Sequence, residues 1–171
     1  MVDSSNRLDP LSVVVLTVSD TRTQSDDTSG QAIVDAVSAA GHSIVERAIL
    51  KDDLLQLRSE FGRWISDPGV QIVISTGGTG ITRRDVTPEA LEPLISKRID
   101  GFGELFRSLS YAEIGASTIQ SRAVGAICHT TLVFLLPGST NAVRLALDKI
   151  LLPQLDRRTT PCNFAKLLPR L

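Results

Sequence analysis

The sequence predicts an α/β fold, a three-layer α/β/α sandwich in which helices cover both faces of a mostly parallel central sheet. Short β-branched runs alternate with segments of helical periodicity through the first half of the chain, as in proteins with right-handed strand–helix–strand crossovers. The first of these runs, which begins at Leu11, is typical of a strand buried on both faces. A chain of 171 residues can bury such a sheet without disulfide or metal cross-links.

The first half of the chain is predicted to contain three strands, at residues 11–18, 43–50 and 70–76. Asp27 or Thr28 can cap a helix after the first strand, and Gly41 ends that helix. A second helix follows the acidic pair at residues 52–53, and Pro68 ends it. Both helices carry apolar residues every three or four positions, so each has one face to bury on the sheet.

Two helices are predicted after the third strand. Thr87 followed by Pro88 predicts a helix start, because Thr is a good N-cap and Pro fits the first helical position. We expect this helix over residues 88–96 and a further helix over residues 102–111.

The end of the chain is predicted to contain the antiparallel part of the sheet. Residues 123–127 and 131–136 are two strands too close for a helical crossover, so they should form a small antiparallel hairpin. Ser139 then caps a long amphipathic helix, which Pro153 should end or kink. The tail beyond it has no clear period.

Composition excludes several classes of protein. Apolar residues make up 42% and charged residues 22%, which excludes a disordered or fibrous chain. A formal net charge of -1 argues against non-specific nucleic-acid binding. The apolar runs are far shorter than the roughly 20 residues that cross a membrane, and the polar N-terminus has no signal-peptide core. We expect one cytoplasmic domain over residues 1–171, with residues 1–10 a flexible N-terminus.

Polar and glycine residues gather where the predicted parallel strands end. Open α/β sheets bind ligands at this edge, so these residues form the predicted binding site. They are Ser19, Asp20, Asp52, Thr76, Gly77, Gly78, Thr79, Gly80, Pro137, Gly138 and Ser139.

The glycine segment STGGTG after the third strand suits a phosphate. It is neither a Walker A motif nor a dinucleotide fingerprint, because the required lysine and glycine spacings are absent. Its amides and the Thr76 and Thr79 hydroxyls can still donate to an anion, with Arg83 and Arg84 supplying charge. The alternative is an ordinary tight turn that needs positive φ.

Two aspartates near the glycine segment indicate a metal site. Asp85 would repel a phosphate unless a cation lies between them, and Mg²⁺ bridging carboxylate and phosphate oxygens meets that need. Helix capping, solvation or an arginine partner are the alternatives for Asp85. Of Asp52 and Asp53, one can cap the following helix and the other can share the metal. Two carboxylates would hold Mg²⁺ and orient an attacking oxygen for phosphoryl transfer.

Histidine and cysteine offer no catalytic group. His42 follows a helix-stop glycine and His129 lies in the hairpin turn, so both are assigned to structure or solvent. Cys128 and Cys162 lack the spacing of a zinc or redox motif and are expected to be reduced. Any chemistry would therefore rest on positioning and electrostatics.

Five stretches together resemble one known family. LTVSDTR, DDTSG, STGGTGITRRDVTPEA, GFGELFR and LPGST occur in the order and spacing of the MoaB/MogA family of molybdenum cofactor biosynthesis proteins. The match covers roughly residues 11–165 and looks closest to the MoaB branch, including the tail RTTPCNF.

The resemblance implies a three-layer α/β fold assembled as a homotrimer, or as a hexamer made of two trimers. It implies an activity in which molybdopterin is adenylylated with Mg-ATP and pyrophosphate is released, before a partner enzyme inserts molybdenum. It places the family's glycine loop on residues 76–80 and its essential, metal-holding aspartates on Asp85 and Asp52.

Some positions depart from the family pattern and others keep it. The usual proline before the second aspartate is Lys51 here, and Ser139 and Thr140 replace a frequent proline and lysine. Arg83, Arg84, Asp85, Val86 and Thr87 are kept in the form seen in active adenylyltransferases, which favours catalysis. A non-catalytic molybdopterin carrier, or an oligomeric scaffold like a relative within the animal protein gephyrin, are the alternatives.

Overall fold

The structure, a computed structural model, describes residues 8–171, and within them one six-stranded sheet runs in the order β2-β1-β3-β6-β5-β4. Strands β2, β1, β3 and β6 pair in parallel, whereas β5 pairs antiparallel with both β6 and β4. The strands are β1 (Ser12–Val18), β2 (Ser43–Leu50), β3 (Ile72–Thr76), β4 (Lys97–Arg98), β5 (Val124–Cys128) and β6 (Thr131–Leu136).

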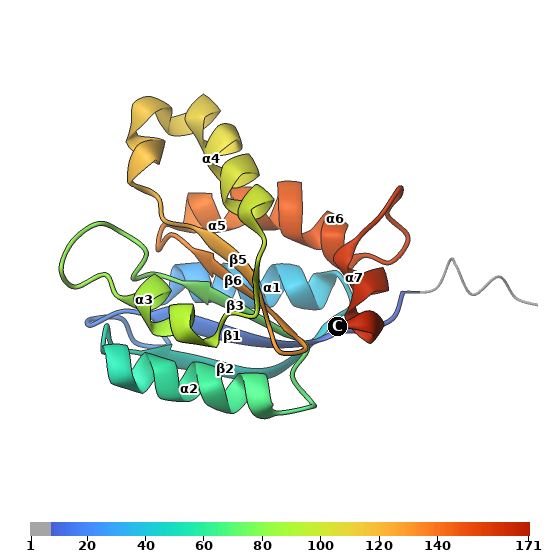
Figure 1. Cartoon of the computed structure of the whole chain (residues 1–171). Coiled ribbons are helices and arrows are strands. Elements are labelled where there is room, and N and C mark those ends of the chain that lie inside the picture. The colour runs from blue at the N-terminus through green and yellow to red at the C-terminus, as the bar shows by residue number, and fades with distance from the viewer. Residues whose placement is uncertain (1–7) are drawn as a thin grey trace, which may run out of the picture.

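Helices cover both faces of this sheet, which confirms the predicted three-layer α/β/α sandwich (Figure 1). Helices α2 and α3 pack on one face; α1, α4, α5, α6 and α7 contribute to the other. The helices are α1 (Thr28–Ala39), α2 (Leu54–Ser66), α3 (Thr87–Leu91), α4 (Asp100–Ile114), α5 (Thr140–Ala146), α6 (Leu152–Leu155) and α7 (Phe164–Leu167).

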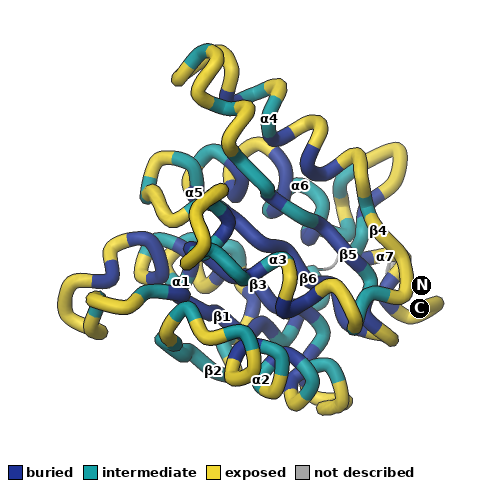
Figure 2. Tube along the Cα trace, turned by 60° about the vertical axis from the view of Figure 1, so that its left-hand side comes forward, coloured by how far each residue is buried: buried dark blue, intermediate teal, exposed yellow. Residues whose placement is uncertain are grey.

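Three of the parallel strands, β1, β3 and β6, are buried on both sides, whereas the edge strand β2 is only partly buried. Along β1, Val13 and Val15 pack into one core and Val14 and Leu16 into the other, because alternate side chains leave a strand on opposite faces. Figure 2 shows these central strands buried, whereas the far end of α4 is largely exposed. The sheet is therefore a rigid support for loops at its edges.

Most predicted elements are confirmed. Strand β2 has the predicted bounds, and β5 and β6 form the predicted hairpin. The helix predicted at residues 88–96 is shorter, since α3 ends at Leu91 and a 3₁₀ turn, η2 (Glu92–Leu94), follows. Pro93 explains the change, because it has no N–H to continue the α-helical ladder. Strand β4, only two residues long, was not predicted.

The long helix near the C-terminus is continuous but irregular. α5 is followed by a π-helical segment, η4 (Leu147–Leu151), and then by α6, so Pro153 lies within the final turn of a distorted helix. Beyond it, Asn163 caps α7, whose single turn was too short to give a periodic signal.

The predicted flexible N-terminus at residues 1–10 falls largely on residues 1–7, which lie outside the described residues. Across residues 8–171, the helices are too short or too polar to cross a bilayer.

Candidate functional site

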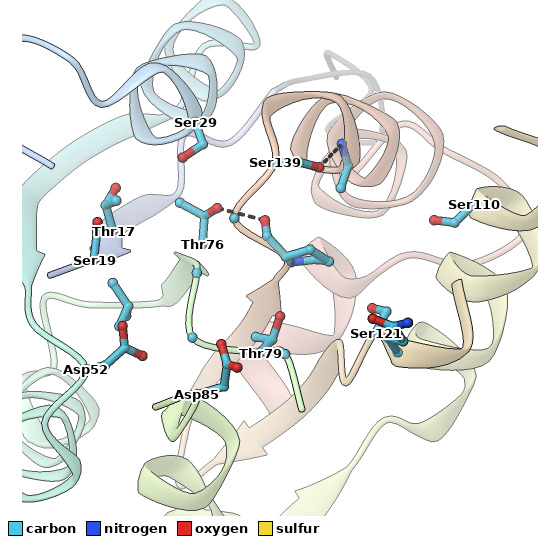
Figure 3. A pocket seen from close by; sticks show the side chains of 18 of the residues that line it. Thr17, Ser19, Ser29, Asp52, Thr76, Thr79, Asp85, Ser110, Ser121 and Ser139 are labelled. Carbon is cyan, nitrogen blue, oxygen red and sulfur yellow. Dashed lines mark hydrogen bonds between the residues drawn. The ribbon is translucent and has the colours of Figure 1, made fainter. Parts of the chain in front are cut away.

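A cavity of about 490 Å³ opens at the carboxyl edge of the parallel strands. One side is built from the ends of β1, β3 and β6 and from the segment after β2 (Figure 3). The other side comes from α4 and the 3₁₀ segment after it, η3 (Gly115–Gln120). Both the place and the volume are those of small-molecule sites in α/β proteins.

Most of the predicted site residues line this cavity, although four separate segments of the chain contribute them. They are Ser19, Asp20, Asp52, Thr76, Gly77, Gly78, Thr79, Gly80, Asp85, Pro137, Gly138 and Ser139. Three predicted residues, Arg83, Arg84 and Thr87, lie outside the lining.

Gly77 and Gly78 form the tight turn after β3. Their φ angles of +98° and +64° lie in the left-handed region that favours glycine. A Cβ atom on Gly77 would lie 2.1 Å from the carbonyl oxygen of Val18, and one on Gly78 would lie 2.5 Å from Asp52 Oδ1. The turn therefore requires glycine and also brings the loop against a cavity carboxylate.

Asp52 is free for the cavity because Asp53 caps the next helix. The Asp53 carboxylate accepts a hydrogen bond from the Gln56 amide at 2.8 Å, so Asp53 is the N-cap of α2. Within residues 8–171, Oδ1 of Asp52 is buried without a hydrogen-bond partner. Burial, followed by the charges of Asp20 and Asp85, raises the pKa of Asp52. A neighbouring cation would relieve this unfavourable setting.

Asp85 lies on the same side of the cavity as Asp52 (Figure 3). Thr82 fixes its carboxylate. Oδ2 of Asp85 accepts hydrogen bonds from the Thr82 amide at 2.9 Å and the Thr82 hydroxyl at 2.6 Å. Burial acts to raise the pKa of Asp85, but the hydrogen bonds from Thr82 and the Gly80 amide, with the charge of Arg122, outweigh it and the net shift is downward. Asp85 is therefore an ionised, oriented carboxylate at neutral pH.

Thr87 does not cap α3, so that prediction is wrong. The helix begins at Thr87 itself, and the residue before it, Val86, makes no side-chain capping bond. The buried Thr87 hydroxyl donates instead to the carbonyl oxygen of Gly77 at 3.1 Å, and its amide donates to Gly78 at 3.1 Å. Thr87 thus holds the glycine turn from behind the cavity.

The two arginines of the loop are exposed and do not belong to the cavity lining. Arg84 forms an ion pair with Asp20, and this hydrogen bond is the main reason that the pKa of Asp20 is lowered. Arg83 borders a shallow surface depression formed by the outer side of the loop. The structure therefore connects Arg84 to the cavity through Asp20.

Several predicted hydroxyl residues also shape the cavity wall. Ser19 Oγ accepts from the amides of Thr21 and Arg22, and the Thr76 hydroxyl donates to the carbonyl oxygen of Pro137 at 2.9 Å. Ser139 caps α5 as predicted, accepting from the Ala142 amide at 3.2 Å. These bonds fix the loops that surround the glycine turn.

A buried carboxylate organises the cavity at the start of α1. Asp27 accepts hydrogen bonds from the Thr17 hydroxyl at 2.8 Å, the Gly30 amide at 2.9 Å and Arg47 at 3.0 Å. Its side chain has no exposed surface. Thr17 lines the cavity, so Asp27 fixes one of its hydroxyls.

The wall opposite the glycine loop was not predicted. Ser110 lies on α4 and Ser121 follows η3, and both face the strand ends across the cavity (Figure 3). The hydroxyl-rich sequence GASTIQS at residues 115–121 could have indicated a polar binding wall. However, its position opposite the glycine loop depends on how α4 packs, which the sequence does not show. The additional lining residues are Thr17, Val18, Arg22, Ser29, Phe106, Ser110, Ile114, Ser117, Thr118, Gln120, Ser121 and Ala142.

The carboxylates fit a magnesium ion that arrives with a phosphate substrate. Over the described chain, no three Asp, Glu, His or Cys side chains group into a metal site. Mg²⁺ commonly uses one or two protein carboxylates and completes its shell with water and substrate phosphate oxygens. The unpartnered Oδ1 of Asp52, with ionised Asp85 nearby, suits that mode of binding.

The histidines and cysteines lie where a structural role was expected. His42 is buried and accepts a hydrogen bond from the Leu11 amide, and His129 occupies the hairpin turn with φ +56°. Cys128 is buried, which raises the pKa of its thiol to about 12, and in the described part of the chain both cysteines are free. None of these four residues lines the cavity.

Comparison with known proteins gives a consistent family. The family model described as "Probable molybdopterin binding domain" matches residues 14–157. Molybdenum cofactor biosynthesis protein B of Escherichia coli K12 is 48% identical over 164 residues, covering 96% of each chain. A crystal structure of molybdenum cofactor biosynthesis protein B superposes with a TM-score of 0.87 at 42% identity, covering 96% of this chain and 99% of that one.

A tungsten cofactor synthesizing protein MoaB from Pyrococcus furiosus superposes with a TM-score of 0.74 at 38% identity, over 82% of this chain and 90% of that one. The match at the level of sequence thus extends to the fold, and it includes the strand ends and the glycine loop that build the cavity. The chain belongs to the MoaB/MogA family of molybdenum cofactor biosynthesis proteins.

Proposed function

We propose that this protein is a molybdopterin adenylyltransferase that uses Mg-ATP and releases pyrophosphate. The observation that carries the proposal is the pair Asp52 and Asp85 beside a glycine turn, in a cavity of about 490 Å³. The match to a family model described as "Probable molybdopterin binding domain" supports molybdopterin as the acceptor. The carboxylates beside the glycine turn suit a metal-bound phosphate donor.

The reaction needs no general base. An ionised oxygen of the molybdopterin phosphate attacks the α-phosphorus of ATP and forms the new P–O bond. The bond from the α-phosphorus to the bridging oxygen breaks, and pyrophosphate leaves with that electron pair. Asp52 and Asp85 would hold Mg²⁺, which would supply charge neutralisation for the phosphates. The lack of a histidine in the cavity lining agrees with this scheme.

The chain's own residues position the reactants. Within the loop at residues 76–80, the amides of Gly78 and Thr79 are the donors to phosphate oxygens, because the Gly77 amide is bonded to the carbonyl oxygen of Leu136 and the Gly80 amide to Asp85. The hydroxyls of Thr76 and Thr79 belong to the same cavity wall. Asp52 and Asp85 are the proposed ligands of the cation. Arg84 balances the charge of Asp20, which otherwise adds to the repulsion around Asp52.

Substitution of the two aspartates tests this assignment. We expect Asp85→Asn and Asp52→Asn each to lower turnover of molybdopterin about a hundredfold or more, the scale of losing one preorganised group that stabilises charge. Asp53→Asn is the matched control, because Asn caps a helix as well as Asp does and Asp53 is absent from the cavity lining. Unchanged turnover in both aspartate variants would contradict the catalytic assignment.

We also propose that the protein is cytoplasmic and assembles as a homotrimer or as a hexamer of two trimers, and that its product passes to an enzyme that inserts molybdenum. Exposed apolar side chains on α4 and η3 support self-association. They are Leu105, Tyr111, Ile114 and Ile119.

A further inference from the structure

Arg122 ties the loop that carries Asp85 to the sheet. It lies between η3 and β5, and its amide donates to the carbonyl oxygen of Thr79 at 3.3 Å. Its Nε donates to the carbonyl oxygen of Gly80 at 2.7 Å, and its Nη2 donates to the carbonyl oxygen of Asp85 at 2.9 Å. A single guanidinium thus joins the two ends of the segment at residues 80–85.

The third nitrogen of the Arg122 guanidinium, Nη1, is also bonded. Nη1 of Arg122 forms an ion pair with Glu89 on α3, and the Arg122 side chain is 32% exposed. A planar fork can satisfy three acceptors in fixed directions, whereas a lysine ammonium presents one freely rotating group. The geometry of this contact therefore requires arginine.

The loop between these two bonds has little other support. Residues 81–84 are all exposed, and Ile81 is 67% exposed, so apolar packing does not hold the segment. Thr82 binds the Asp85 carboxylate, but both residues belong to the same loop and would move together. Thr87 holds only the glycine turn at its start. The exposed ion pair between Arg84 and Asp20 joins one side chain of the loop to the segment after β1, whereas Arg122 binds the main chain of the loop and connects it to the start of β5.

We infer that Arg122 is a positioning residue. By binding the carbonyl oxygens of Gly80 and Asp85, it holds the carboxylate of Asp85 in a fixed position relative to Asp52. The inference rests on the proposed function of the cavity but adds a residue outside its lining. The hydrogen bonds of Arg122 to the loop go to main-chain carbonyl oxygens, and its charge also helps to lower the pKa of Asp85.

The test compares Arg122→Ala and Arg122→Lys with Arg98→Ala. Arg98 is a suitable control, since it is also paired with a carboxylate, Glu92, but makes no bond to the loop among the described residues. Amide hydrogen exchange over residues 79–86 measures the loop directly. We expect exchange there to rise about tenfold or more in both Arg122 variants, as loss of hydrogen bonds to a charged group implies. Exchange in Arg98→Ala should match the wild type.

Kinetics give the second readout. We expect Arg122→Ala to lower kcat about tenfold to a hundredfold, with a smaller change in KM for molybdopterin, and guanidinium at low millimolar concentration to restore part of kcat. Arg122→Lys should recover less than guanidinium does, because it cannot bridge both carbonyl groups. Unchanged loop exchange in Arg122→Ala, or raised exchange with kcat within twofold of the wild type, would overturn the inference.

Failure of the proposed function is distinguishable from failure of this inference. If the wild type binds molybdopterin without adenylylating it, adenylylation is refuted and the Arg122 variants are compared by their affinity for molybdopterin and Mg-ATP. Affinity at least tenfold weaker in Arg122→Ala than in Arg98→Ala would then support the positioning role, and a smaller difference would refute it.

Discussion

At the scale of single residues, Asp52 combines an unfavourable setting in the folded protein with a proposed role in metal binding. Its Oδ1 is buried without a partner among residues 8–171, and its pKa is raised by burial and by two neighbouring carboxylates. Active sites commonly keep such unfavourable groups because the ligand or metal compensates for them.

We therefore expect Asp52→Asn to raise the melting temperature of the magnesium-free protein while it lowers activity. Because the folded-state pKa is raised above the ordinary 3.8, the unfolded state loses its proton first and the folded state carries the penalty at higher pH. The stability gain should thus be present at neutral pH and vanish as the pH falls to about 3.8. Since the site is partly solvated, we expect a gain of about 1 kcal/mol or less.

Thermal unfolding of Asp52→Asn and of the wild type in EDTA, measured across this pH range, checks the expectation. Asp53→Asn provides the control, since it keeps its capping bond to Gln56. A lower melting temperature for Asp52→Asn than for the wild type at neutral pH would show that Asp52 is well accommodated without a cation.

A second prediction at this scale concerns Gly78, whose φ of +64° and contact with Asp52 both exclude a side chain. We expect Gly78→Ala to lower the free energy of unfolding by about 1–3 kcal/mol and to abolish turnover. Gly62 in α2 is the matched control, because a Cβ there meets no atom within 4 Å. Gly62→Ala should raise the free energy of unfolding by about 0.5–1 kcal/mol. Urea unfolding measures both, and equal effects of the two substitutions would contradict the account.

At the scale of elements, the start of α1 depends on Asp27. This carboxylate caps the helix, binds Thr17 and pairs with Arg47, whose side chain is only 15% exposed. Removal of one member of a buried ion pair leaves the other uncompensated. We expect Asp27→Ala to lower the free energy of unfolding by about 3–5 kcal/mol. Asp27→Asn should cost less, because it keeps the capping acceptor.

The pH dependence of that cost has a definite sign. Burial acts to raise the pKa of Asp27, but its hydrogen bonds outweigh burial and the net shift is below 3.8. The ionised carboxylate therefore stabilises the fold above that pH, and the stabilisation is lost as the pH falls through the lower folded-state value. Urea unfolding of Asp27→Ala and of the wild type should converge at acid pH, and a gap independent of pH would refute the assignment.

Elements set by local pattern could be predicted from the sequence, whereas those set by distant contacts could not. Strands β1, β3 and β6 show in their apolar runs, and Asp27 and Ser139 lie at caps that the sequence favours. Thr87 was misassigned because its hydroxyl binds Gly77, ten residues earlier.

The candidate site divides in the same way. The strand-end residues could be predicted because parallel strands end at one edge, and the choice of Asp52 over Asp53 became clear only when Asp53 proved to be the cap. The α4 and η3 wall and the bonds of Arg122 depend on tertiary packing that has no local signature.

At the scale of the whole molecule, the apolar side chains exposed on α4 and η3 predict self-association. Light scattering after size exclusion should give three or six times the chain mass of 18.4 kDa. We expect Ile119→Asp to shift the protein towards the monomer, because Ile119 is 83% exposed within this apolar surface. Leu55→Asp, on the opposite layer at 72% exposure, is the control and should leave the mass unchanged. A monomeric wild type would contradict the assembly.

The central claim is that the cavity transfers an adenylyl group to molybdopterin. A single-turnover reaction of the purified chain with molybdopterin and Mg-ATP, followed by mass spectrometry and pyrophosphate release, tests it most directly. The account predicts adenylylated molybdopterin and pyrophosphate in equal amounts, loss of both with EDTA, and loss of both in Asp85→Asn. Recovery of bound but unmodified molybdopterin, with no pyrophosphate released by the wild type, would contradict it.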